Sequence, residues 1–278
     1  MVRIVSDTST LYDSAQAREA GFDASPLSVT IAGNTYREFD EIRPEEFVAI
    51  INRGNLPTSS QPAVGLVAET YQKYAGEEVL NIAMAAGLSG TYDSAVAARE
   101  LSDEPEKITV INSRTLCGPH RYLVENAVRM ARENKTLQEI VAKTEELMET
   151  GKSYLIPADF DYLRRGGRLS PLVSHVGKMA HLAPVMTQTA DGRQLTIASV
   201  RRGFANAVKY VQKALEERGV GKNWRIYITH GADPAKAEQA RKILAPAFPE
   251  AVIEVYQLSP AFITQGGPSC VAVQVIHA

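Results

Sequence analysis

The chain has 278 residues, of which 45% are hydrophobic and 22% are charged, and this balance argues against a disordered protein. The length favours one large domain or two medium domains. The net charge is -2 and no long basic run occurs, which argues against a protein that binds nucleic acid by neutralising phosphates.

The N-terminal residues Met1–Asp7 read as a short strand that runs into a polar turn. They lack the charged, apolar and small-residue order of a signal peptide, and no apolar stretch is long enough to cross a bilayer. Cys117 and Cys270 lie far apart, so we expect two reduced, packed thiols. The five histidines are scattered, which gives no support for a zinc site. We therefore expect a cytoplasmic protein without a metal or a cofactor and without stable insertion into a membrane.

The first half of the chain, residues 1–151, alternates short apolar strands with helical segments. Such alternation predicts a parallel sheet with helices on both faces, an α/β/α layer. A hairpin is expected around Gly33-Asn34, and a capping box begins the last helix of this half. The expected strands are Arg3–Ser6, Leu27–Tyr36 as the hairpin, Val79–Ala85 and Ile108–Ile111, and the expected helices are Ser14–Ala20, Pro44–Asn52, Val64–Tyr74, Thr91–Glu100, Tyr122–Glu133 and Thr136 to about Thr150.

The second half, residues 152–278, has a different pattern, and Gly151-Lys152 is the expected seam between two domains. An Asp191-Gly192 turn indicates a hairpin, and Asp233-Pro234 has the N-cap and N1 residues of a helix. A hairpin combined with helices predicts a mixed sheet with helices on one face. The expected strands are Pro184–Gln188, Gln194–Ser199, Arg225–Thr229, Val252–Tyr256 and Val271–Ile276, and the expected helices are Phe204–Glu217 and one that begins at Pro234.

The segment Leu56–Pro62 places three hydroxyls and an amide between two prolines, just before the helix expected from Val64. Serine ahead of a helix most often caps it, and this interpretation would explain one of the hydroxyls. It does not explain three in a row. The functional interpretation is an anion or carboxylate site, formed by Ser59, Ser60 and the free backbone N–H groups of a helix start.

The segment Ala86–Tyr92 is a glycine-rich turn between a buried strand and a helix. Open α/β folds bind ligands at this edge of the sheet, although the glycines could merely relieve backbone strain with Ser89 as a cap. The turn is not a Walker loop, because no lysine follows its second glycine, and Gly90 directly after Ser89 argues against a GxSxG nucleophile. The sequence leaves both interpretations of the turn open.

The segment Asp161–Ser170 contains two arginines, then two glycines and then Arg168. The glycines are typical of a helix C-cap, where the arginines face the negative end of the helix. Arg168 could also reach an anionic group. The apolar period of Val173–Leu182 indicates ordinary core rather than the lining of a lipid site.

Five segments together make the chain resemble the DegV family, in matching order over nearly its whole length. They are IVSDTS at Ile4–Ser9, LPTSSQP at Leu56–Pro62, GLSGTYDSA at Gly87–Ala95, YLRRGGRLS at Tyr162–Ser170 and GGP at Gly266–Pro268. The third and fourth are specific in combination. The resemblance implies two domains, an α/β/α layer followed by a mixed sheet with helices. It also implies a bound long-chain fatty acid, similar to palmitate, stearate or oleate, between the two domains.

The resemblance also implies which residues hold the carboxylate. In the family it contacts the first hydroxyl of a TSQP-like motif, which falls on Ser59, and the serine of LSGT, which falls on Ser89. Ser60, Gly90 and Thr91 belong to the same two motifs, so we expect them at the same site. Some members are the acyl-binding subunit of a bacterial fatty acid kinase, whose separate kinase subunit supplies ATP.

Members with the kinase role carry an arginine before the penultimate helix and a histidine in an HxGPG segment. The arginine falls on Arg202, with Arg201 as a close rival, and the histidine position holds Gln265. Glutamine can hydrogen-bond an oxyanion but cannot become cationic or move a proton. We therefore expect lipid binding to survive this departure better than phosphoryl transfer, in a protein that is not itself an enzyme.

Three hypotheses follow from these residues. The first is a fatty-acid carrier, because each buried methylene contributes about 0.8 kcal/mol and the carboxylate finds its partners at the mouth of a tunnel. The second is a stand-alone serine acyl-hydrolase, which needs a histidine base close to Ser89. The third is a binder of phosphate or sugar phosphate that uses the same hydroxyl motifs.

Overall fold

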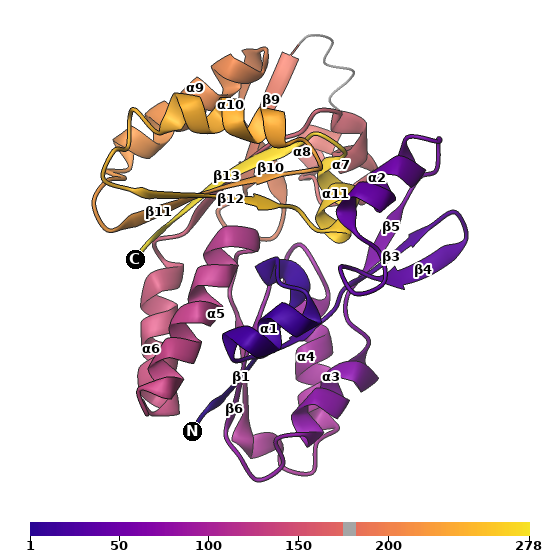
Figure 1. The fold of residues 1–278 in the computed structure, drawn as a ribbon, viewed down its shortest axis with the longest axis vertical. Helices are drawn as coiled ribbons and strands as arrows, with labels where there is room; N and C mark the ends of the chain where they lie inside the picture. Colours follow the sequence, from indigo (N-terminus) through magenta and orange to yellow (C-terminus); the bar gives the residue numbers. More distant parts are fainter. Residues whose placement is uncertain (175–181) are drawn as a thin grey trace.

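Four parallel strands form the first sheet of the computed structural model, which describes residues 1–174 and 182–278 (Figure 1). The strand order is β2-β1-β6-β7, and every neighbouring pair is parallel. The strands are β1 (Arg3–Asp7), β2 (Asp23–Ser25), β6 (Val79–Ala83) and β7 (Ile108–Asn112). Parallel strands need covered faces, which explains why β6 is apolar along most of its length and buried throughout.

Helices cover both faces of this sheet, as the alternation in the sequence predicts. Successive side chains of β1 point to opposite faces: Ile4 packs with Ala17 and Val124, whereas Val5 packs with Val67. The first face carries α1 (Ser14–Ala20), α5 (Cys117–Arg132) and α6 (Leu137–Met148), and the second carries α3 (Val64–Gln72) and α4 (Thr91–Glu100). The predicted α/β/α layer is therefore confirmed.

Six strands form the second sheet, in the order β10-β9-β8-β13-β11-β12. Only β11 and β12 are parallel; the other neighbours are antiparallel, so the sheet is mixed as predicted. The strands are β8 (Lys152–Ile156), β9 (Leu182–Gln188), β10 (Leu195–Arg202), β11 (Trp224–His230), β12 (Val252–Gln257) and β13 (Val271–His277), and one face is covered by α9 (Phe204–Glu217) and α10 (Pro234–Leu244). The opposite face turns toward α5 and the first sheet (Figure 1).

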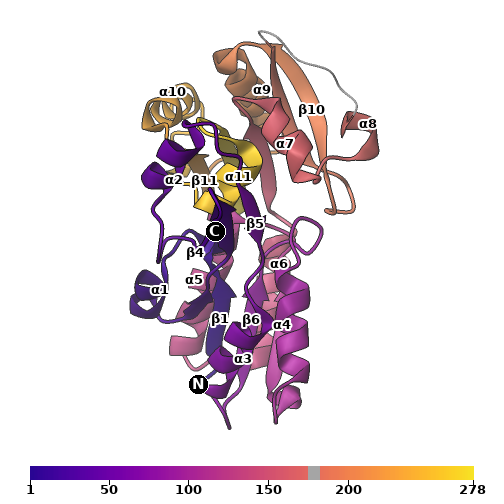
Figure 2. The same ribbon diagram turned by 90° about the vertical axis from the view of Figure 1, so that its right-hand side faces the viewer.

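A small three-stranded sheet, β4-β3-β5, lies beside the two large ones (Figure 2). Its hairpin of β3 (Ser28–Ile31) and β4 (Asn34–Arg37) is the predicted one, whereas the polar strand β5 (Thr58–Ser60) is too short to recognise from a pattern. The helix α11 (Pro260–Gly266) packs against β3, β5 and α2 (Pro44–Ile51). Because this late segment of the chain packs against the first half, the division into domains at residue 151 stays a prediction.

The other predicted elements agree with the structure apart from their ends. The helix expected from Tyr122 begins five residues earlier at Cys117, since Gly118 and Pro119 occupy its first turn instead of preceding it. The Thr136 capping box and the Gly167 C-cap are both present. The C-cap belongs to α7 (Phe160–Gly166), of which the sequence indicated only the last turn. The elements that the sequence did not predict are η1 (Thr8–Thr10), β2, β5, η2 (Pro105–Lys107), β8, α8 (Pro171–Ser174) and α11.

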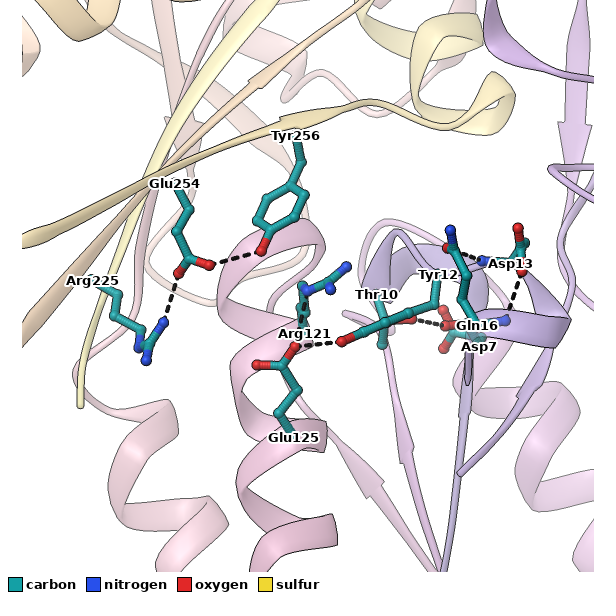
Figure 3. A network of polar contacts seen from close by, with 10 residues as sticks. All are labelled: Asp7, Thr10, Tyr12, Asp13, Gln16, Arg121, Glu125, Arg225, Glu254 and Tyr256. Atoms are coloured by element: carbon teal, nitrogen blue, oxygen red, sulfur yellow. Dashed lines mark hydrogen bonds and ion pairs between the residues drawn. The ribbon is translucent and has the colours of Figure 1, made fainter. Parts of the chain in front are cut away.

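Polar and aromatic contacts join α5 to the second sheet and to the N-terminal loop (Figure 3). The guanidinium of Arg121 lies 3.5 Å from the ring centre of Tyr12 and 4.5 Å from that of Tyr256. It pairs with Glu125 at 3.0 Å, and Glu125 also accepts the Tyr12 hydroxyl at 2.6 Å. Tyr256 in turn donates to Glu254 at 2.8 Å. These contacts hold β12 against α5 and therefore fix one side of the junction between the two large sheets.

Candidate ligand-binding site

A cavity lies between the second sheet, the turn after β6 and the helix α11. It comprises about 1030 Å³ of space outside the atoms, part of which is open to solvent. Its described lining comes from both halves of the chain and is mainly apolar, with Met84, Leu88, Leu155, Leu163 and Met186 as examples. The cavity is therefore suited to a long apolar ligand.

The alternation of side chains along β13 explains why one sheet serves both a core and a cavity. Val271, Val273 and Val275 point to the helices α9 and α10 and are fully buried. Cys270, Ala272 and Gln274 point the other way and line the cavity. On the neighbouring strand β8, Leu155 pairs with Ala272 and lines the same wall. Along these residues the second face of the sheet is thus a cavity wall, whereas further along it Tyr227 and Ile276 pack against Leu123 and Leu147 in a separate core.

The structure brings Ser59, Ser60, Ser89 and Gln265 to this one cavity. Ser59 lies on the edge strand β5, where it pairs with Val29, and its hydroxyl accepts a hydrogen bond from Gln265 Nε2 at 3.0 Å. Ser89 lies in the turn between β6 and α4. The two serine motifs and the C-terminal glutamine, far apart in sequence, therefore line one cavity, and the glutamine contacts Ser59 directly.

Gly90 and Thr91 do not line the cavity themselves but contact residues that do. The Thr91 hydroxyl lies 2.8 Å from Ser89 Oγ, and Thr91 is almost fully buried. A Cβ on Gly90 would lie 3.1 Å from the amide carbon of Gln61, whose side chain lines the cavity. Both residues thus position groups that line the cavity.

Helix capping does not account for the hydroxyls. The N-cap of α3 is Ala63, and the N-cap of α4 is Gly90, neither with a side-chain cap. Ser89 Oγ accepts only a long contact of 3.3 Å from the backbone N–H of Thr91. The capping interpretation is therefore wrong for the Leu56–Pro62 motif and at most partial for Ser89.

Close packing, not strain, explains the first glycine of the Ser89 turn. Neither Gly87 nor Gly90 has a positive φ. A Cβ on Gly87 would lie 2.2 Å from the Cα of Arg193, in the turn of the β9–β10 hairpin. Only glycine lets the turn that carries Ser89 approach the second sheet this closely, so Gly87 helps to close the cavity.

The structure does not bring Arg202, the arginine expected at the site, to the lining of the cavity. Leu195, at the start of β10, lines the cavity, whereas Arg202 ends the same strand about 23 Å away at 3.3 Å per residue. Arg202 is exposed, and Arg201 stacks on Tyr210 with 4.8 Å between guanidinium and ring centre. Arg168 lines the cavity instead, and its Nε donates to the Leu88 carbonyl at 3.1 Å. Of these three arginines, the structure therefore brings Arg168 to the cavity lining.

The IVSDTS motif supports the turn that leads to Ser89. The Asp7 carboxylate accepts the backbone N–H groups of Ser9 at 2.9 Å and Met84 at 3.0 Å. His120 is fully buried against Ser9, 2.5 Å away, and burial lowers its pKa, so its imidazole is held neutral. No histidine lines the cavity among the described residues, and Ser89 pairs with Thr91. The histidine base that an acyl-hydrolase requires is therefore not at Ser89 within residues 1–174 and 182–278.

Sequence reasoning missed Glu38, which fastens α11 to the first half. Its carboxylate accepts the Thr8 hydroxyl at 2.5 Å and the backbone N–H of Ala261, in the first turn of α11, at 2.8 Å. Glu38 is fully buried, and this burial raises its pKa. Since α11 carries Gln265, Glu38 positions the glutamine against Ser59. A lone acid after a hairpin gives no signal of this role in the sequence.

Glu38→Gln should flatten the pH dependence of stability. Because the pKa of Glu38 is raised in the folded state, the folded chain keeps a proton that the unfolded chain loses above its ordinary value of 4.5. The free energy of unfolding should therefore fall as the pH rises from that value through the raised pKa. Glutamine does not titrate, and its amide can still accept the Ala261 N–H. Urea unfolding at a series of pH values measures this, and superimposable profiles for the two proteins would contradict it.

The two cysteines lie in the cavity wall as free, buried thiols. Burial raises the pKa of Cys117 and raises that of Cys270 to about 12, so both are held as neutral thiols.

Within the described residues, no group of three or more His, Cys, Asp or Glu side chains could hold a metal ion. In the same residues, no helix is both long and apolar enough to span a membrane. Most of Val173–Leu182, interpreted as core from sequence, lies outside the described residues.

Comparison with known proteins gives the same picture of the fold. A DegV domain-containing protein of Listeria innocua is 29% identical over 271 residues, which cover 96% of this chain and 95% of the relative. The crystal structure of DegV, a fatty acid binding protein from Bacillus subtilis, matches with a TM-score of 0.88 and 22% identity over 100% of this chain and 99% of that one. A DegV family protein from Eubacterium eligens, loaded with heptadecanoic acid, matches with a TM-score of 0.86 and 19% identity over 100% of both chains.

The family model described as "Uncharacterised protein, DegV family" matches residues 1–278, which is the whole chain. The order of the five sequence motifs and the two-sheet fold agree with that match. This protein belongs to the DegV family.

Proposed function

We propose that this chain binds one long-chain fatty acid in the cavity, with the carboxylate held at Ser59, Ser89 and Gln265. The observation that carries the proposal is that these three polar side chains line one mainly apolar cavity, in which Gln265 donates a hydrogen bond to Ser59. An acyl chain gains about 0.8 kcal/mol for each methylene it buries, and hydroxyl and amide groups supply hydrogen bonds for the head group. Related folds support the same ligand class, since two of them are described as fatty-acid binding or fatty-acid loaded.

The presence of Arg168 in the cavity wall favours a ligand whose head group is an anion. It is the one charged residue among the described residues that line the cavity. Its guanidinium donates to the carbonyls of Leu88 and Gly166, which hold it in place at this wall. A carboxylate that leaves water needs such a nearby cation, because an unpaired buried charge is very costly. We therefore assign the charge of the ligand to the end of the cavity where Arg168 lies.

A titration with a fluorescent long-chain fatty acid tests this function, with Arg168→Ala and Arg202→Ala compared. Arg168→Ala should weaken binding by about 1.5–3 kcal/mol, the usual contribution of a hydrogen bond to a charged group. Arg202→Ala removes the same charge from an exposed position outside the cavity and should leave the affinity unchanged. The natural chain must first bind the fluorescent fatty acid saturably. If it takes up no fatty acid, the proposed function is refuted. A larger loss from Arg202→Ala would contradict the assignment of Arg168.

We also propose that the chain can present its fatty acid to a separate kinase subunit in the cytoplasm, but presents it poorly. Gln265 donates to Ser59 and so lies where a histidine cation would stabilise the charge of acyl phosphate formation. Glutamine keeps a donor at this place and lacks the charge. Lipid binding and phosphoryl transfer should therefore respond differently to changes at Gln265.

Gln265→His should raise the rate of phosphorylation in an assay reconstituted with a bacterial fatty acid kinase subunit, with little change in lipid affinity. Gln265→Leu is the matched control, because it removes the donor without adding a cation and should not raise the rate. Equal and efficient phosphorylation of the natural chain and the histidine variant would show that the charge at this position is unimportant.

A further inference from the structure

A second group of polar side chains lies in the cavity wall, away from Ser59 and Ser89. Gln274 on β13 lines the cavity and is only 1% exposed. Its Nε2 donates to the Leu116 carbonyl at 2.9 Å and to Ser153 Oγ at 2.9 Å. Its Oε1 is buried and has no hydrogen-bond partner within the described part of the chain. One buried acceptor in the wall of the cavity is therefore unused.

The orientation of this amide is fixed by its neighbours. Turning it over would place Oε1 against the Leu116 carbonyl, so both N–H groups must stay where they are. Ser153 lines the cavity as well, and its hydroxyl accepts from Gln274 while its own hydrogen has no acceptor among the described residues. A free acceptor and a free donor therefore stand side by side.

A ligand can explain this pair in a way that packing cannot. A buried, unpaired polar atom costs about as much as a lost hydrogen bond, so it calls for a partner. Among the described residues with an unpaired buried side-chain atom, Gln265 and Gln274 line the cavity, whereas Tyr227 and Thr229 of the same sheet do not. Gln265 belongs to the head-group site already assigned, at Ser59. Gln274 differs from Tyr227 and Thr229 because its side chain forms part of the wall that an occupant would touch.

The pair lies far from the end that holds the carboxylate. The Sγ of Cys270 packs against Gly266, the neighbour of Gln265, and so marks the carboxylate end of β13. Gln274 lies four residues further along the same face, which is about 13 Å at the usual rise of a strand. A fatty acid with its head at Ser59 and Ser89 would thus meet Gln274 and Ser153 with its methylene chain.

We propose that Gln274 and Ser153 form a hydroxyl-binding site and that the preferred ligands are long-chain fatty acids with a hydroxyl on the chain. A hydroxyl donates to Gln274 Oε1 and accepts from Ser153, so it satisfies both free groups at once. A keto oxygen would satisfy only Ser153, and a plain methylene chain satisfies neither. The inference rests on the proposed fatty-acid function and names the class of acid that the cavity selects.

Oleic acid and ricinoleic acid test the inference, since they share one chain and differ by a single hydroxyl. Displacement of a fluorescent fatty acid gives the affinity ratio of the two acids for each protein. The natural chain should bind ricinoleic acid more tightly than oleic acid. Gln274→Met should shift the ratio about tenfold toward oleic acid, because the hydroxyl then loses its acceptor inside an apolar wall. Ser153→Ala should shift the ratio in the same direction while leaving the Gln274 amide in place.

Comparing the two acids distinguishes a failure of this inference from a failure of the proposed function. If oleic acid binds and the natural chain binds ricinoleic acid no more tightly, the hydroxyl site is wrong and the carrier function stands. If neither variant changes the ratio, the unused acceptor serves an internal water, and the inference is overturned. Binding of oleic acid by each variant also reports that the variant is folded. Should Gln274→Met fail to bind oleic acid, the ratio for Ser153→Ala decides the question.

Discussion

Replacing Ser59 and Ser89 together by alanine should weaken the binding of a long-chain fatty acid by about 3–6 kcal/mol. Each hydroxyl is expected to make one hydrogen bond to the carboxylate, and a hydrogen bond to a charged group contributes about 1.5–3 kcal/mol. The combined loss corresponds to roughly two to four orders of magnitude in Kd. Each single variant should show about half of this loss. Isothermal calorimetry or displacement of a fluorescent fatty acid measures the affinities.

Thr58→Ala is the matched control for this pair of serines. Thr58 is the neighbour of Ser59 on β5, but it is exposed and does not line the cavity. Its loss should leave the affinity unchanged, and all variants should keep the melting temperature of the natural chain within a few degrees. Ser59 does not cap a helix and Ser89 accepts only a long 3.3 Å contact from the first turn of α4, so little stability depends on them. Full affinity in the double variant would mean that the carboxylate lies elsewhere.

The second large effect is expected from Ala272→Trp, which should block the cavity between its two polar ends. Ala272 lies on β13 between Cys270, near the carboxylate end, and Gln274. An indole at this place would occupy space that the chain needs beyond the head group. Excluding about five methylenes would cost about 4 kcal/mol, or nearly a thousandfold in Kd. The affinity for octanoic acid, which is short, should change far less than the affinity for oleic acid.

Ala272→Ser is the control for substitution at this position, because serine is too small to fill the cavity. This variant should bind octanoic acid and oleic acid with the same affinities as the natural chain. The larger side chain also adds strain of about 1–3 kcal/mol, so circular dichroism melting must show that Ala272→Trp is folded. Equal loss for the short and the long acid would contradict a chain that runs along β13. Unchanged binding of oleic acid would place the ligand outside the cavity altogether.

Regular elements were predictable because single strands and helices carry their own patterns. Thr91–Glu100 and Phe204–Glu217 were predicted with the same bounds as in the structure, since caps and turn residues mark their ends. The two serine motifs could be recognised as candidates because hydroxyls cluster there without a structural need. What these patterns report is local, and each of these features is set by residues close in sequence.

Features that depend on tertiary packing could not be predicted. The strand β5 has three polar residues and exists only because β3 offers a free edge to pair with. Arg202 and Arg168 could not be told apart, since Arg168 lies in the cavity wall through its contact with Leu88, 80 residues away in sequence. Glu38 and Gln274 gave no signal either. Their roles follow from neighbours more than 100 residues away, namely Ala261 for Glu38 and Leu116 for Gln274.

Native mass spectrometry of the protein purified from bacterial cells tests the central claim most directly. The account predicts one long-chain fatty acid bound to each chain, released on unfolding and identified by its mass. It further predicts that the Ser59→Ala, Ser89→Ala double variant carries much less of that lipid when purified in parallel. A natural chain that is bare, or that carries phosphate or a sugar phosphate in place of a fatty acid, would contradict the account.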